Sequence, residues 1–174
     1  MAIIPDTKNW TWVLSERCPD CRFDAAAVDV SDMGHLIRQN AAAWRTVLAH
    51  EHVRLRPTDD RWSALEYGCH VRDVFVLFDQ RLELMLVEDA PIFANWDQDA
   101  SAVADDYGSQ DPGQVATELL VAAAALAQRF DAVSGCDWER TGFRSDGAAF
   151  TVDSFARYLL HDPVHHLHDV AALN

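Results

Sequence analysis

The chain has 174 residues, with 28 acidic and 14 basic side chains, so its formal net charge is −14. This length suffices for one domain with its own hydrophobic core. The charge argues against nucleic acid as a partner, because phosphate binding needs a basic surface and Lys8 is the only lysine. No apolar run reaches the roughly 18–20 residues that cross a bilayer, and residues 1–6 do not resemble a secretory signal. We therefore expect a cytoplasmic protein with no membrane partner and with four reduced cysteines.

Four segments show the periodicity of amphipathic helices, at residues 31–50, 63–88, 111–135 and 151–173. The second opens with a capping box, in which Ser63 and Glu66 satisfy each other's backbone N–H groups. The third opens with Asp111 as N-cap and Pro112 at the first helical position. Connections of unequal length join the segments. The pattern predicts an all-α fold, a four-helix bundle that forms a single domain over residues 1–174, with an irregular N-terminal arm at about residues 1–30.

Two further features concern the connections and the last helix. Residues 89–110 and 136–150 are polar and are predicted as loops. Pro163 lies inside the last segment, where proline removes a backbone hydrogen bond, and it predicts a kink beside His161.

Histidine is concentrated in the last segment, where residues 161–168 hold four of the eight in the chain. His161 and His165 are four residues apart, so both rings leave one face of a helix. His70 lies beside the apolar stripe of the second segment, where it can meet them. Three imidazoles and an open position would make a metal site of the catalytic type. The alternative is a helix with solvated histidines; His168 is the best substitute third ligand.

Several neighbours can serve such a site. Asp162 can orient a ligand imidazole by accepting its second N–H. Tyr158 can present its hydroxyl to a cleft, or pack within the bundle. Arg144 can bind a carboxylate of a substrate or thiol cofactor, or remain a solvated loop residue. Glu66 is either a general base one turn before His70 or the partner in the capping box, and the capping role is favoured.

The pair Cys18-x-x-Cys21 has two functional interpretations, a redox pair or half of a zinc site. A zinc site needs two more ligands, and Cys69 and Cys136 form no second pair of this kind. No strand precedes the pair, so a thioredoxin-like placement fails. We interpret Cys18 and Cys21 as structural or incidental.

The stretch Trp62-Ser63-x-x-Glu66-x-x-x-His70, the later His161-x-x-x-His165 and residues 144–151 together resemble the DinB/YfiT-like superfamily. The resemblance spans about residues 32–170. It implies a four-helix bundle in which His70, His161 and His165 hold a divalent metal ion, with zinc as the first choice and nickel or iron as alternatives. The arm with its two cysteines and Pro163 depart from the family pattern.

The superfamily includes mycothiol-dependent maleylpyruvate isomerase and bacillithiol S-transferases. The resemblance therefore implies a transferase or isomerase that uses mycothiol or another low-molecular-weight thiol on a small-molecule substrate. A metal ion in such a site lowers the pKa of a thiol or a water molecule in its open position. A metal-dependent hydrolase is the alternative enzyme, and a non-catalytic, stress-related ligand-binding bundle is the alternative class. The surplus of Trp and Leu is compatible with a homodimer.

Overall fold

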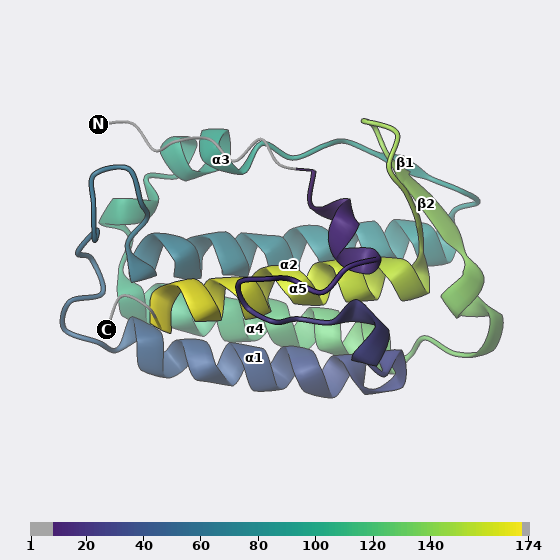
Figure 1. Cartoon of the computed structure of the whole chain (residues 1–174), viewed down its shortest axis with the longest axis horizontal. Coiled ribbons are helices and arrows are strands. Elements are labelled where there is room, and N and C mark those ends of the chain that lie inside the picture. Colours follow the sequence, from purple (N-terminus) through teal and green to yellow (C-terminus); the bar gives the residue numbers. More distant parts are fainter. Residues whose placement is uncertain (1–8, 172–174) are drawn as a thin grey trace.

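The computed structural model describes residues 9–171, and four long helices lie side by side in it (Figure 1). They are α1 (Met33–Leu48), α2 (Ala64–Val87), α4 (Pro112–Asp131) and α5 (Val152–Ala171). Helix α2 contacts both α4 and α5, and so does α1. The helical bundle predicted from the sequence is thus present. Residues 1–6 and the predicted helix end near Leu173 lie outside the described residues.

A small sheet sits at one end of the bundle (Figure 1). Strand β1 (Ile92–Phe93) pairs in parallel with β2 (Thr141–Arg144), and β2 pairs antiparallel with β3 (Ala149–Thr151). Gly147 has φ +96° in the connection between β2 and β3, a conformation that favours glycine. These segments were predicted as loops, so the fold is not strictly all-α.

The remaining elements are short. The two long connections contain α3 (Gln98–Ala104), the 3₁₀ helix η4 (Tyr107–Ser109) and η5 (Gly135–Glu139). The N-terminal arm contains η1 (Trp10–Leu14), η2 (Ala25–Ala27) and η3 (Val30–Asp32). All three turns of the arm contact α5, which the arm crosses in Figure 1. Arg157 of α5 donates to the carbonyl oxygens of Ala25 and Val28, which ties the arm to that helix.

Side-chain caps form at the starts of α2 and α4, at the residues that the sequence predicts. The Glu66 carboxylate accepts from the backbone N–H of Ser63 at 2.8 Å, while the Ser63 hydroxyl accepts from the N–H of Glu66 at 3.3 Å. Arg56 also donates to Glu66, at 2.9 Å from its Nε. Asp111 accepts from the N–H of Gln114 at 2.8 Å. Each cap satisfies backbone donors that the first helical turn leaves unpaired.

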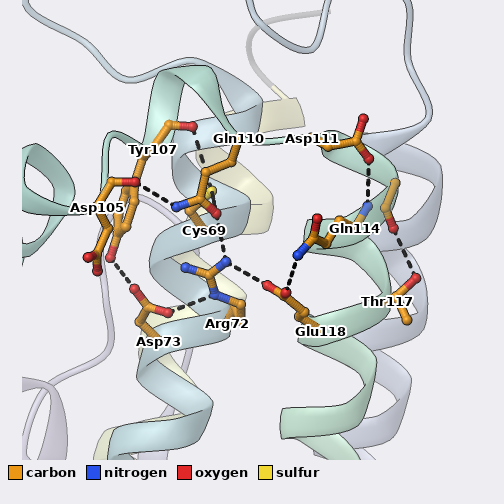
Figure 2. Close-up of polar contacts among 11 residues, drawn as sticks. Cys69, Arg72, Asp73, Asp105, Tyr107, Gln110, Asp111, Gln114, Thr117 and Glu118 are labelled. Carbon is orange, nitrogen blue, oxygen red and sulfur yellow. Dashed lines mark hydrogen bonds and ion pairs between the residues drawn. The ribbon is translucent and has the colours of Figure 1, made fainter.

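A polar network fixes η4 against α2 and α4 (Figure 2). The Tyr107 hydroxyl donates to Asp73, and the Gln110 amide donates to the Asp105 carbonyl at 2.9 Å. Arg72 is the centre of the network, because its guanidinium donates to three side chains: Asp73 (2.8 Å), Gln110 (2.7 Å) and Glu118 (2.9 Å). The Cys69 sulfur faces this network, 3.8 Å from the carbonyl oxygen of Tyr107.

The hydrophobic core lies between the four long helices. Its largest fully buried side chains include Trp44, Phe75, Leu82, Leu119, Leu126 and Phe155. Burial of each such side chain contributes roughly 1.5–3 kcal/mol. Within residues 9–171, no helix combines the length and the hydropathy that a membrane span requires. The bundle thus provides a rigid frame for the polar side chains of α5.

Candidate metal centre

Helix α5 carries two pairs of potential ligands that are offset by one residue. Each pair has a spacing of four, His161 with His165 and Asp162 with His166. Because an α-helix turns by about 100° per residue, adjacent pairs leave the helix on different faces. The first pair meets the N-terminal arm, and the second meets α2.

On the α2 side, His70, Asp162 and His166 can offer ligand atoms that all lie within 4.8 Å of one another. Nε2 of His70 is 3.4 Å from both carboxylate oxygens of Asp162. Nε2 of His166 lies 3.8 Å from Asp162 Oδ1. The other ring nitrogen of His166, Nδ1, lies 3.0 Å from Asp169 Oδ2. A carboxylate on the outer nitrogen fixes the orientation of a ligand imidazole. Two imidazole nitrogens thus point at one carboxylate.

The charge of Asp162 and the burial of His70 suit the binding of a divalent cation. Burial opposes ionisation of Asp162, but His70 and His166 lower the pKa of this carboxyl to about 2, so it is ionised at neutral pH. Its Oδ1 is buried and accepts no hydrogen bond from the described residues. His70 is fully buried, and Trp96 stacks on its ring with the centroids 5.3 Å apart. Two histidines and one carboxylate form a common ligand set for catalytic zinc and for iron.

On the arm side, Cys18, Cys21, His161 and His165 form a second group whose ligand atoms also lie within 4.8 Å of one another. Cys18 Sγ is 3.6 Å from Nδ1 of His165, and the ring centroids of His161 and His165 are 5.0 Å apart. Burial lowers the pKa of His161 to about 4, so this imidazole is neutral at neutral pH. A neutral imidazole is the form that binds metal.

The residues predicted from the sequence are therefore divided between two groups. His161 and His165 lie together, as their spacing implies, but their close neighbours are the cysteines of the arm. His70 lies with Asp162 and His166 instead. His168 is exposed and belongs to neither group among the described residues.

A pocket with a volume of about 120 Å³ adjoins both groups. Two arginines line it. Arg144 is ion-paired with Asp146 at 2.8 Å and donates to the Tyr158 hydroxyl at 3.1 Å. Arg81 is buried and donates to the Ala94 carbonyl at 2.7 Å, and it has no carboxylate partner within residues 9–171. Burial and the nearby charge of Arg144 lower the pKa of Arg81 to about 10, which leaves it protonated at neutral pH.

Sequence reasoning missed three features of this region. It did not include His166 in the metal site, although Asp162 and His166 have the same spacing as His161 and His165 and could have been recognised by it. It treated Cys18 and Cys21 apart from the histidines. It did not single out Arg81, although an arginine three residues after Phe78, on the apolar stripe of the helix, is a signal of a buried charge.

Comparison with known proteins supports the family resemblance. The family model of the DinB superfamily matches residues 34–170. Among solved structures, the fold is similar to that of YfiT from Bacillus subtilis, described as "a probable metal-dependent hydrolase with an unusual four-helix bundle topology". That match has a TM-score of 0.65 and 14% sequence identity, and it covers 99% of this chain and 93% of the other. No curated protein matches the sequence.

Proposed function

The chain belongs to the DinB superfamily, and on that premise we propose that it is a metal-dependent hydrolase of a small anionic molecule. The observation that carries the proposal is the group formed by His70, Asp162 and His166 beside a pocket that holds Arg81 and Arg144. The description of YfiT as a probable metal-dependent hydrolase agrees with it.

We assign the ion to His70, Asp162 and His166, with Asp169 orienting His166. A divalent ion bound there would polarise a substrate oxygen and lower the pKa of a water molecule. The three-histidine set predicted from the sequence, His70 with His161 and His165, is the competing assignment. The two assignments share His70. In the first, Asp162 and His166 bind the ion that supports turnover; in the second, His161 and His165 bind it.

The arginines of the pocket determine that the preferred substrate is an anion. Arg81 has no carboxylate partner among the described side chains, so an anionic group of the substrate is its natural counterion. Arg144 lies close enough to Arg81 to lower its pKa, and an anion between them relieves this repulsion. Burial raises the pKa of Tyr158, so its hydroxyl keeps a proton that can be donated to a substrate oxygen. Trp10 and Trp96 line the same pocket and give it apolar surface.

The test combines metal analysis with turnover of a panel of small carboxylated or phosphorylated esters and amides. We expect His70→Ala and His166→Ala to lose a metal ion and to abolish hydrolysis. His168→Ala is the matched control, because this exposed histidine belongs to neither group, and it should change neither property. Retention of full metal content and turnover in His166→Ala, together with their loss in His165→Ala, would favour the three-histidine set.

A second candidate function is the thiol-dependent transfer or isomerisation that the family resemblance implies. The pair Arg81 and Arg144 favours it for a thiol that carries free carboxylates, such as bacillithiol or glutathione, because arginine binds carboxylates. Turnover that requires mycothiol, bacillithiol or glutathione would replace hydrolysis as the activity. Metal binding without turnover in either panel would identify a non-catalytic binding protein.

A further inference from the structure

We propose that Cys18, Cys21, His161 and His165 form a second metal site, a closed structural zinc site that fastens the N-terminal arm to α5. The proposal does not rest on the hydrolase assignment, because it uses different ligands. It also changes the role of His161 and His165, which the sequence assigned to a metal site of the catalytic type together with His70.

The donor atoms lie close enough together to converge on one zinc ion. All four lie within 4.8 Å of one another, and Cys18 Sγ is 3.6 Å from His165 Nδ1. Zinc bonds of about 2.3 Å to sulfur and about 2.05 Å to nitrogen, at the tetrahedral angle, separate the two donors by about 3.6 Å. Two thiolates and two imidazoles complete the coordination of zinc. Such a set leaves no open position and is typical of structural sites.

The backbone around the cysteines forms a tight turn that presents both sulfurs. The N–H of Arg22 donates to the Cys18 carbonyl at 3.1 Å, and the N–H of Cys18 donates to the Phe23 carbonyl at 2.8 Å. Arg22 has φ +66°, in the left-handed region that non-glycine residues rarely adopt. Its carbonyl accepts from Nε of Arg17 at 2.9 Å. A strained conformation held by several hydrogen bonds is common at ligand sites.

A buried nitrogen of His161 has no hydrogen-bond partner among the described residues. His161 is 4% exposed, and its Nε2 is buried and forms no hydrogen bond with the described residues. Trp10 and Phe23 pack against its ring, with centroids 5.3 and 5.4 Å away. An unpaired polar atom in such a place costs about 1–3 kcal/mol, which coordination to a metal removes.

A redox-active disulfide is the competing interpretation of Cys18 and Cys21. Cys18 belongs to the arm and is fully buried against α5, so a redox partner could not reach its sulfur directly. A disulfide would also leave Nε2 of His161 buried without a partner. Coordination of one cation engages all four side chains, so the geometry favours zinc.

Zinc would add to contacts that already join the described part of the arm to α5. The described polar ties between the arm and α5 include the bonds from Arg157 to the carbonyls of Ala25 and Val28, beyond the cysteine turn. The family match begins at residue 34, so both cysteines precede it, while both histidines lie within it. Zinc here would join a segment outside the family match to the helix that carries the enzymatic ligands.

The experiment loads the full-length protein with cobalt(II) and records its absorption spectrum beside its metal content. We expect about two equivalents per chain and a thiolate-to-cobalt charge-transfer band, since only the arm site contains thiolates. Cys21→Ser should lose the band and one equivalent but keep the ion at His70. Cys136→Ser is the control, because this exposed cysteine lies in neither group, and it should keep both ions.

His70→Ala separates this proposal from the proposed function, since it should keep the charge-transfer band while losing the other ion. A measurement on the unsubstituted, zinc-bound protein does not depend on whether the variants fold. Modification of its thiols with a mercurial reagent should release one equivalent of zinc, detected with a chromogenic chelator. Reduced parent protein that shows no charge-transfer band, or thiol modification that releases no zinc, overturns the proposal. So does a native Cys18–Cys21 disulfide.

Discussion

Replacement of Glu66 by alanine tests whether this carboxylate is a structural cap or a catalytic base. The residue is 4% exposed, and its carboxylate accepts from both the N–H and the hydroxyl of Ser63, each at 2.8 Å. Arg56 donates to it from the other side. All these partners belong to the start of α2 and to the loop before it, so we expect the substitution to reduce stability and to leave metal content unchanged.

Two interactions of the Glu66 carboxylate set the expected cost of Glu66→Ala. Its loss leaves the buried N–H and hydroxyl of Ser63, a residue that is 1% exposed, without their acceptor, which costs about 1–3 kcal/mol. The ion pair with Arg56, whose side chain is 37% exposed, adds at most about 1 kcal/mol. We expect about 3 kcal/mol in total, which lowers Tm by about 6–12 °C for a chain of this length.

The pH dependence of the unfolding free energy gives an independent check on the structural role of Glu66. Burial alone would raise the pKa of Glu66, but hydrogen bonds from Arg56 and Ser63 outweigh it and the pKa is lowered overall. A carboxyl with a lowered pKa stabilises the fold above the pKa of the unfolded chain, about 4.3, and loses this contribution as pH falls through the folded value. The difference in unfolding free energy between parent and Glu66→Ala should therefore be constant near neutral pH and shrink below about pH 4.

Urea denaturation of parent, Glu66→Ala and Glu66→Gln measures these differences. Glu66→Gln is the control, because it keeps an acceptor for Ser63 while removing the charge that faces Arg56, and it should cost about 1 kcal/mol. A Glu66→Ala variant within about 0.5 kcal/mol of the parent would refute the reasoning. If that variant also lost turnover with metal content intact, Glu66 would be a base.

Three further substitutions test the packing, each by the shift of the urea midpoint. Gly34→Ala places a Cβ 2.8 Å from the carbonyl oxygen of Ala127, where α1 crosses α4, and should cost about 1–3 kcal/mol; an unchanged midpoint would mean that the helices separate freely. Tyr107→Phe removes the hydrogen bond to Asp73 and should cost about 1–2 kcal/mol, whereas a gain in stability would contradict this role. Phe155→Ala leaves a cavity in the core and should cost about 3–5 kcal/mol; a cost below about 1 kcal/mol would contradict its burial.

The helices could be predicted because their signals are local. Ser63 with Glu66 and Asp111 with Pro112 identified two helix starts, which the structure places within a residue of the prediction. The sheet could not be predicted, because strands of two to four residues are too short to show an alternating pattern.

The candidate site was predictable only in part, for a reason that lies in helix geometry. The spacing of four identifies His161 with His165 and equally Asp162 with His166, and the rotation of α5 decides which pair faces α2. Tertiary packing sets that rotation. The contact between Cys18 and His165 joins residues 147 positions apart, which no local pattern reveals.

The two walls of the pocket are built from different kinds of structure. The ion ligands and Arg81 belong to long helices, whereas Arg144 lies on the short strand β2 and Trp96 lies in the connection that follows β1. Connecting segments accept substitutions and insertions more readily than packed helices do. Substrate preference can therefore diverge among descendants of this chain through changes near Trp96 and Arg144, while the helices that hold the cation stay constant.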